Sequence, residues 1–170
     1  YLKNAIAKEN NIIKKLDLKP LPEEGGFFKR ILESPKFLDL SHEDQKRYGG
    51  SRREYSLINY LMTSTQFSAL HTVKSDEAWT YIAGSPIDLC VINPETGELS
   101  HIFLDKNNPQ YIVPRDFIFG AMPVEKQPNS FSLATCEVRP GFEYDDFFLC
   151  LKEELLEKFP LLTKEINLFT

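Results

Sequence analysis

The chain has 170 residues, of which 42% are hydrophobic and 26% are charged, as in an ordinary globular domain with a sizeable core. Its 20 basic and 25 acidic residues give a net charge of -5, which argues against nucleic acid or an anionic membrane as a partner. No apolar run approaches the roughly 18 residues that span a bilayer. We therefore expect a cytoplasmic protein. Tyr1 is not a methionine, which leaves the native N-terminus and any cleaved targeting segment open.

The N-terminal region predicts a helix followed by a turn and a strand. Apolar residues recur at helical spacing over residues 2 to 17, and Pro20 ends that pattern. Gly25-Gly26 then predicts a turn into a strand near residues 27 to 34, because glycine accepts positive φ. The same turn would place Glu24 at the rim of a pocket, where glycine lets the backbone approach a ligand.

The middle of the chain predicts a loop and then a series of strands. Residues 35 to 53 are polar and rich in turn residues, so we expect a long mobile loop with an exposed His42. From residue 55 onward, short segments rich in β-branched and aromatic residues alternate with turn residues. These segments cover residues 55–63, 67–73, 77–83, 87–93, 99–104, 110–113, 116–121 and 131–138. So many short strands predict an all-β sandwich or closed barrel.

The C-terminal region returns to helical spacing, at residues 151 to 159 and in a shorter piece at 162 to 168. We see no repeat and no linker, so we expect one domain over residues 1 to 170, with a β-barrel at about 27 to 149 between helical ends. The cysteines are odd in number and widely separated, which favours buried free thiols over a disulfide framework. Their reactivity stays open for all three: Cys90, Cys136 and Cys150.

The stretch from Ser68 to Gly84 carries most of the chemistry of the chain. If it forms two strands joined by a short turn at residues 74 to 76, side chains of one parity share a face. That face would carry Phe67, Ala69, His71, Val73, Glu77, Trp79, Tyr81 and Ala83. The alternation therefore predicts one imidazole and one carboxylate meeting among aromatic rings.

This stretch resembles the first motif of the cupin superfamily, in which a His-x-His pair is followed by a glutamate and then by a glycine. His71 stands at the first histidine, Glu77 at the glutamate and Gly84 at the glycine, whereas Val73 occupies the second histidine. In the second cupin motif the proline would be Pro114, but its glycine is missing, and Phe119 stands at its histidine.

Four boxes, in order, are similar to one branch of small, mostly uncharacterised cupins. They are PEEGGFFKR at residues 22–30, LMTSTQFSALHTVKSDEAW at 61–79, YIVP at 111–114 and RPGFEYDDF at 139–147. The resemblance implies a cupin-type double-stranded β-helix, that is, a jelly-roll barrel with N- and C-terminal helices. It implies little about activity, because members of that branch generally carry no established reaction.

Many cupins hold a metal with three histidines and a glutamate, and imidazole with carboxylate suits Zn, Mn, Fe or Ni. A protein metal site normally needs at least three protein ligands. Only His71 and Glu77 remain here, because Val73 and Phe119 cannot ligate, and His101 lies in a different predicted strand. We therefore expect no cofactor; if a metal binds, His71 and Glu77 are its ligands.

An enzymatic function stays open. A histidine beside a carboxylate can act as a general base, so His71 and Glu77 are the candidate catalytic pair of a metal-independent sugar epimerase or isomerase. Metal-free epimerases among the cupins also use a tyrosine as proton donor, and the tyrosines open to that role are Tyr60, Tyr81 and Tyr144. A metal-dependent cupin enzyme or a storage-like structural protein is a further alternative.

A protein that only binds a ligand needs fewer specific residues than an enzyme does. A small polar, sugar-like or nucleotide-like molecule would meet flat apolar walls and a few orienting polar groups in the barrel. The candidate ligand-binding residues are Glu24, Phe67, His71, Glu77, Trp79, Tyr81, Phe117 and Phe119. Aromatic residues in a barrel also serve as plain core. The ligand itself cannot be read from the sequence.

We also expect a homodimer, because several strands are apolar on both faces. One such strand carries Leu57, Ile58, Tyr60, Leu61 and Met62, and another carries Phe117, Ile118, Phe119 and Met122. One face of each strand fills a barrel, so the other face needs a cover. Cupins commonly pair through sheet faces or by lending an N-terminal strand, which here would be residues 27 to 32.

Overall fold

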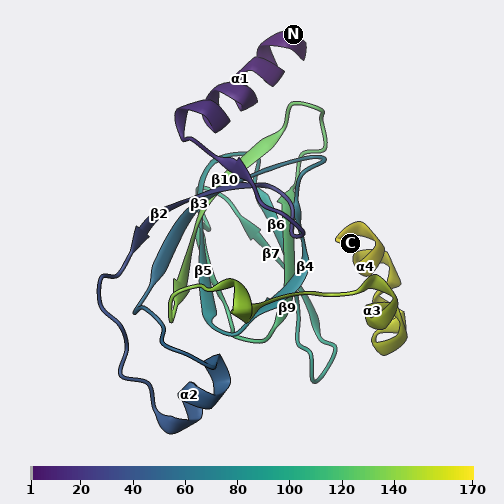
Figure 1. Cartoon of the computed structure of the whole chain (residues 1–170). Helices are drawn as coiled ribbons and strands as arrows, with labels where there is room; N and C mark the ends of the chain where they lie inside the picture. The colour runs from purple at the N-terminus through teal and green to yellow at the C-terminus, as the bar shows by residue number, and fades with distance from the viewer. Residues whose placement is uncertain (1) are drawn as a thin grey trace.

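The computed structural model describes residues 2–170, with side chains from residue 9 onward, and shows two antiparallel sheets packed face to face (Figure 1). The six-stranded sheet has the order β1 (Lys19–Pro20), β2 (Phe27–Glu33), β3 (Ser56–Thr63), β10 (Phe131–Arg139), β5 (Asp76–Gly84) and β8 (Gln110–Val113). The five-stranded sheet has the order β11 (Phe147–Leu149), β4 (Ser68–Val73), β9 (Ile118–Pro123), β6 (Ile87–Ile92) and β7 (Leu99–Leu104). The predicted all-β architecture is thus confirmed.

The space between the two sheets is filled by a cluster that we call the barrel core. Inward side chains alternate with outward ones along each strand, as the pleat requires. The barrel core consists of Tyr60, Met62, Val73, Trp79, Ile87, Leu89, Val91, Leu104, Val113, Phe119, Ala121, Ala134, Cys136 and Val138. Both sheets contribute to it, which joins them into one jelly-roll barrel.

Helices lie outside the barrel. They are α1 (Leu2–Lys15), α2 (His42–Tyr48), α3 (Lys152–Lys158) and α4 (Thr163–Leu168), with short 3-10 turns η1 (Tyr144–Asp146) and η2 (Pro160–Leu162). In Figure 1, α3 and α4 lie against the outer face of β4 and β9. A second cluster, the helix-side core, fills that contact: Leu70, Cys90, Ile92, Ile118, Met122, Leu155, Phe159, Ile166 and Phe169.

The strand prediction agrees with the structure to within two residues at each end for all eight segments between residues 55 and 138. The predicted hairpin of residues 68 to 84 is also present. Two strands, β1 and β11, were not predicted. They contain only two and three residues, and such short runs carry no readable alternation because pairing with β2 and β4 alone defines them.

The prediction that residues 35 to 53 form one uninterrupted loop is wrong, because α2 lies within them. Ser41 caps α2 by accepting a hydrogen bond from the Asp44 backbone at 3.1 Å. Arg52, 5% exposed, forms two 2.8 Å hydrogen bonds with the carboxylate of Asp146, which is fully buried. This ion pair joins positions 94 residues apart, so no local pattern announces it. His42 is exposed, as predicted.

The apolar strand faces that were predicted to need a second subunit as cover are largely buried within the chain. Leu61, Met62 and Phe119 are at most 1% exposed. Ile118 and Met122 belong to the helix-side core, because α3 and α4 cover the outer face of β9. Most side chains that suggested an uncovered sheet face are therefore covered within the chain.

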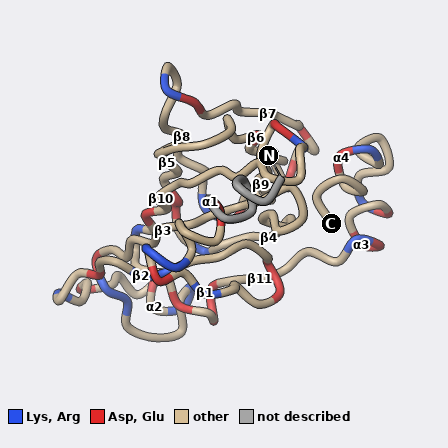
Figure 2. The backbone as a smooth tube through the Cα atoms, turned by 90° about the horizontal axis from the view of Figure 1, so that it is seen from above, with Lys and Arg blue, Asp and Glu red and all other residues tan. Residues whose placement is uncertain are grey.

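The described surface mixes both charge signs. Figure 2 shows basic and acidic positions interspersed along the loops and helices of the described chain, outside the grey N-terminal stretch. Within the same range, no helix is long and apolar enough to cross a membrane.

Candidate functional site

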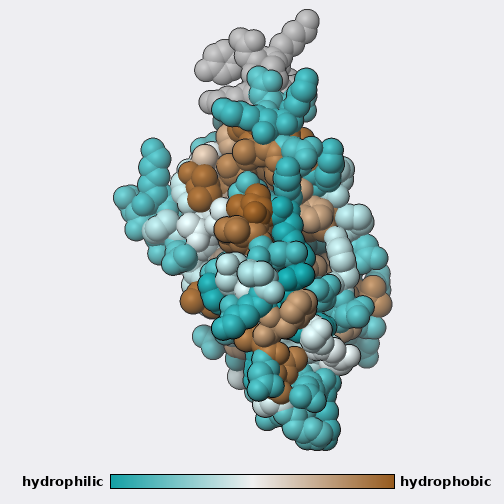
Figure 3. Space-filling view, turned by 60° about the vertical axis from the view of Figure 1, so that its left-hand side comes forward, coloured by the Kyte–Doolittle hydropathy of each residue, from teal (hydrophilic) through white to brown (hydrophobic). Residues whose placement is uncertain are grey.

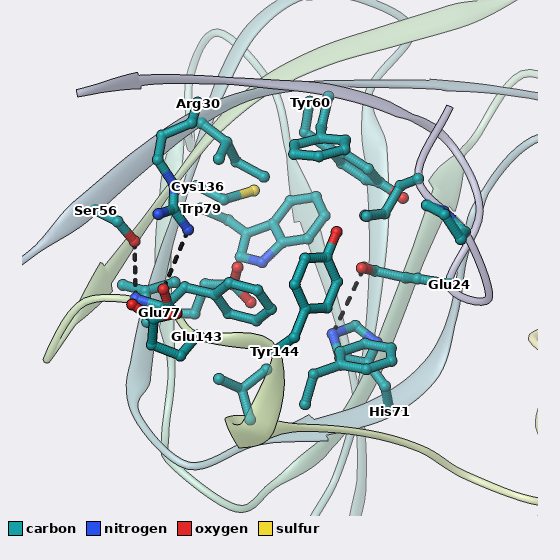
Figure 4. Close-up of a pocket in the computed structure, with 18 residues that line it drawn as sticks. Glu24, Arg30, Ser56, Tyr60, His71, Glu77, Trp79, Cys136, Glu143 and Tyr144 are labelled. Atoms are coloured by element: carbon teal, nitrogen blue, oxygen red, sulfur yellow. Dashed lines mark hydrogen bonds and ion pairs between the residues drawn. The ribbon is translucent and has the colours of Figure 1, made fainter. Parts of the chain in front are cut away.

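A cavity of about 240 Å³ lies between the two sheets at one end of the barrel. Strands β2, β3, β4, β5 and β10 form its walls, and the turn before β2 and the segment of residues 142 to 147 complete it. In Figure 4, Glu24 and His71 lie on one side, Glu77 and Arg30 on the other, and Trp79 between them. Tyr144 lies across the front of this view and is 59% exposed, which places it at the mouth.

An irregularity in β4 decides which of its side chains face the cavity. Ser68 pairs with Ala121 and His71 with Phe119, so β4 has one more residue than β9 over this interval. Such a bulge reverses the alternation. Ser68 and His71, three residues apart, therefore both face Glu24.

The turn before β2 directs Glu24 into the cavity. Gly25 adopts a φ of 101°, and a Cβ at this position would collide with the backbone carbonyl of Phe67, so glycine is required. The turn is anchored to both sheets: the Tyr60 hydroxyl donates to the Gly25 carbonyl at 2.6 Å, and the Ala69 N–H donates to the Glu24 carbonyl at 2.9 Å. The predicted turn is confirmed, and Glu24 lines the cavity.

His71 is 2% exposed and is held in one tautomer. Its Nδ1 lies 2.7 Å from the carbonyl oxygen of Ala69. A carbonyl only accepts, so Nδ1 carries the proton and Nε2 presents a lone pair. Nε2 lies 3.6 Å from Glu24 Oε1. Burial lowers the pKa of His71 despite the nearby Glu77 carboxylate, which keeps the imidazole neutral at pH 7.

Two carboxyl groups in the cavity titrate near neutrality. Burial raises the pKa of Glu24 to about 7, against a 2.6 Å hydrogen bond from Ser68 Oγ that favours the ionised form. Burial also raises the pKa of Glu77 to about 7; His71 lowers it, and the charge of Glu24 raises it further. Both groups therefore change charge in the physiological range, as catalytic and ligand-binding carboxyls do.

Two buried polar atoms lack a hydrogen-bond partner among the side chains that the structure describes: Glu77 Oε2 and Trp79 Nε1. The residues are 8% and 1% exposed. The indole N–H is close enough to lower the pKa of Glu77 slightly, although the pair does not have hydrogen-bond geometry. Unpaired buried groups of this kind cost about 1–3 kcal/mol each.

The mouth of the cavity is built by the segment after β10. Arg30 Nη2 donates to the Phe142 carbonyl at 3.1 Å, and the Phe142 N–H donates to Ser56 Oγ at 2.9 Å. The Arg52–Asp146 ion pair holds the far end of the same segment. Residues that were predicted to lie in a mobile loop thus support the mouth.

Four of the eight predicted binding residues line the cavity: Glu24, His71, Glu77 and Trp79. The other four, Phe67, Tyr81, Phe117 and Phe119, do not. Phe67 packs against the helix-side core, because the bulge in β4 reverses its side. Tyr81 lies further along β5 with its hydroxyl donating to the Gly84 carbonyl at 2.7 Å.

The remaining two predicted binding residues pack behind the cavity. Phe117 lies against the barrel core. Phe119 is buried, with its ring centroid 4.2 Å from that of His71. These aromatic side chains lie outside the cavity lining, because alternation gives a face of the sheet and not a depth along the barrel.

The carboxyl group that lies next to His71 is not the one that the sequence predicted. The carboxylate at ion-pair distance from His71 is Glu24, whereas Glu77 acts on His71 only through its charge. Sequence reasoning missed Ser68, Arg30, Phe142 and Glu143 as neighbours of the site. The boxes at residues 22–30, 61–79 and 139–147 contain all four and were the available signal.

The cavity side chains do not fit a resident metal. Over residues 9–170, whose side chains are described, no group of three or more His, Cys, Asp or Glu side chains is placed to hold one. His71 Nδ1 is used by the Ala69 carbonyl, and the nearby side chains of Val73 and Phe119 offer no ligand atom. We therefore consider only binding and proton transfer by the side chains of this chain.

Comparisons with known proteins agree with this architecture. A family model described as "Cupin superfamily (DUF985)" matches residues 10–150. A hypothetical protein from Leishmania major is 30% identical with a TM-score of 0.82, over 95% of this chain and 97% of that chain. A protein from Shewanella oneidensis is 32% identical with a TM-score of 0.81, over 95% and 96%.

More distant structures share the fold alone. Oxalate decarboxylase from Bacillus subtilis has a TM-score of 0.55 at 14% identity, over 91% of this chain and 37% of that chain. Among curated proteins, none matches the chain. The predicted cupin jelly roll with terminal helices is confirmed.

Proposed function

This chain belongs to the cupin superfamily, in the family described as DUF985, and we propose that it binds a small polar molecule in the cavity of its barrel. The convergence of Glu24, His71 and Glu77 on one cavity carries the proposal. A carboxyl whose pKa rises from 4.5 to about 7 costs about 3 kcal/mol of stability above pH 7. An apolar filling would avoid that cost, so the groups favour a ligand over a purely structural interior.

The size of the cavity limits the ligand. Pockets for drug-sized molecules span about 300–1,000 Å³, and this one holds about 240 Å³. A monosaccharide-sized compound matches that space. The nucleotide part of a larger ligand would have to extend through the mouth past Tyr144.

A thermal-shift screen of monosaccharides, nucleotides and nucleotide sugars tests the proposal. A ligand present at 100 times its Kd stabilises the folded state by about 2.7 kcal/mol. Ile58→Phe would fill the cavity and abolish the shift, because Ile58 lines it. Leu57→Phe is the matched control, because Leu57 is the preceding residue of β3 and does not line the cavity. This variant should keep the thermal shift. Equal shifts in both variants would refute binding in the barrel.

A metal-independent proton-transfer enzyme is the second candidate. The observation that favours it is the fixed His71 tautomer, whose Nε2 lone pair is free to accept a proton while Glu24 lies 3.6 Å away. Such an enzyme would exchange a carbon-bound proton of its ligand with solvent. NMR of a bound sugar in D₂O tests this: exchange that His71→Gln abolishes supports catalysis, and no exchange leaves binding alone.

We propose that the protein is a homodimer through the outer face of the six-stranded sheet. Exposed apolar side chains remain on its strands, with Leu32 54%, Ile82 49% and Ile112 59% exposed. Figure 3 shows apolar side chains gathered among hydrophilic ones on the side of the molecule where β2 lies. Because β2 pairs with β3 of its own chain, we place the dimer contact on the sheet face and not on a strand exchanged between subunits.

Light scattering at micromolar concentration tests the dimer. A stable isologous contact buries more than about 1,200 Å² in total. The mass should therefore be about twice the 19.6 kDa of the chain. A monodisperse monomer would show this proposal to be wrong and would leave the proposed ligand site untouched.

A further inference from the structure

The chemical class of the ligand follows from two unpaired polar atoms on β5 residues that line the cavity. Glu77 and Trp79 are two residues apart on β5, so their side chains share the inner face. Among the described residues, Trp79 Nε1 is a donor without an acceptor, and Glu77 Oε2, in the ionised state of that carboxyl, is an acceptor without a donor. Both residues are more than nine-tenths buried and line the cavity.

A ligand group that satisfies both atoms must donate and accept. An ammonium group only donates, which would leave the indole N–H of Trp79 unpaired. A carboxylate or phosphate only accepts, and it would bring negative charge beside Glu24 and Glu77. A hydroxyl does both with one oxygen: its proton meets Glu77 Oε2, and its lone pair meets the indole N–H.

The rest of the cavity matches a compound with several hydroxyls and no charge. His71 Nε2 and the carboxyl of Glu24 offer a second polar position on the opposite side. Among the described side chains, Arg30 is the one Lys or Arg in the lining, and it is already bonded to Glu33 and to the Phe142 carbonyl. Apolar walls between the polar positions suit the C–H faces of a sugar ring.

Building on the proposed function, we infer that the cavity binds an uncharged polyhydroxy compound of monosaccharide size, one hydroxyl of which bridges Glu77 Oε2 and Trp79 Nε1. The indole N–H is then a specificity determinant and not only part of a wall. A ligand lacking that hydroxyl would leave two buried polar atoms unpaired, and such losses discriminate strongly.

Three hexoses that differ in one group serve as probes: D-glucose is neutral, D-glucosamine is cationic and D-glucuronate is anionic. D-xylose and myo-inositol extend the neutral set. Binding is measured by saturation-transfer NMR and thermal shift at millimolar concentration and neutral pH. We expect at least one neutral probe to bind at least about tenfold more tightly than both charged hexoses, because each charged group forfeits a buried hydrogen bond.

Trp79→Phe removes the indole N–H and keeps an aromatic ring, and we expect it to weaken the neutral probe about tenfold or more. Tyr81→Phe is the matched control: it also removes a donor from β5, but outside the cavity lining, and should leave affinity unchanged. If Trp79→Phe does not fold, as judged by circular dichroism, Glu77→Gln tests the other half of the bridge. It should weaken the neutral probe about tenfold, because an amide oxygen accepts a hydrogen bond less strongly than an ionised carboxylate does.

The outcomes separate this inference from the proposed function. Preferred binding of D-glucosamine or D-glucuronate, or equal affinity in Trp79→Phe and Tyr81→Phe, overturns the hydroxyl bridge and leaves a ligand site in place. Failure of all neutral probes to bind, while a nucleotide shifts the melting temperature, overturns it in the same way. Failure of every compound in both screens overturns the proposed function as well.

Discussion

The two sides of β4 show how differently this molecule uses buried space. Leu70 and His71 are neighbours in sequence and are 0% and 2% exposed. Leu70 belongs to the helix-side core, which is packed from aliphatic, aromatic and sulfur-containing side chains. His71 faces a cavity that also holds Glu24 and Glu77. The helix-side core stabilises the fold through close apolar packing. In the cavity, burying ionisable groups costs free energy, which a bound ligand can offset.

The largest effect on the free energy of unfolding is expected from Leu70→Ala, which removes a side chain from the helix-side core. Removing a fully buried leucine side chain should lower the free energy of unfolding by about 2–5 kcal/mol. Urea denaturation at pH 5 and pH 8 should give the same loss, because no titratable group of the cavity is touched. A loss confined to one pH would contradict the separation of the two cores.

Glu77→Gln sharpens the comparison from the cavity side. The unfolded chain loses this proton near pH 4.5, and the folded protein retains it until about pH 7. The folded state thus binds more protons in that window, and this group makes stability fall as pH rises through it. The variant should gain up to about 3 kcal/mol at pH 8 and almost nothing at pH 4.5.

Glu143→Gln is the matched control for that experiment. Glu143 lies exposed at the mouth of the cavity, so its removal deletes the same charge without relieving burial. Urea denaturation at both pH values should show little change. Equal gains in the two variants would mean that net charge, and not burial of Glu77, sets the pH dependence.

His71→Ala should lower the free energy of unfolding by less than Leu70→Ala does. The neutral imidazole contributes its packing and one hydrogen bond, to the Ala69 carbonyl, so the loss should be about 1–2 kcal/mol. Ligand-induced stabilisation should fall in this variant while the fold stays intact by circular dichroism. A loss as large as that of Leu70→Ala would instead favour a structural histidine.

Metal removal is expected to have the smallest effect of all. The side chains of the cavity do not provide a set of three metal ligands within the described residues. Treatment with EDTA should leave the melting temperature and any ligand shift unchanged. Near-stoichiometric Zn, Mn, Fe or Ni in elemental analysis of the purified protein would contradict this expectation.

Local sequence determined most of the architecture, because alternation and turn residues act between near neighbours. The strands from residue 55 to 138, the glycine turn at Gly25-Gly26 and the terminal helices could all be predicted. The cavity positions of Glu77 and Trp79 also followed from alternation along one regular stretch of strand.

Only the tertiary structure decided the partners across the barrel. The bulge in β4 brings Ser68 to the side of His71 and turns Phe67 away, and its extra residue is defined by the register with β9. Glu24 meets His71 across 47 positions of the chain, and Arg52 meets Asp146 across 94. Such contacts depend on how the two sheets close on each other, because neither member of a pair leaves a periodic signal near the other.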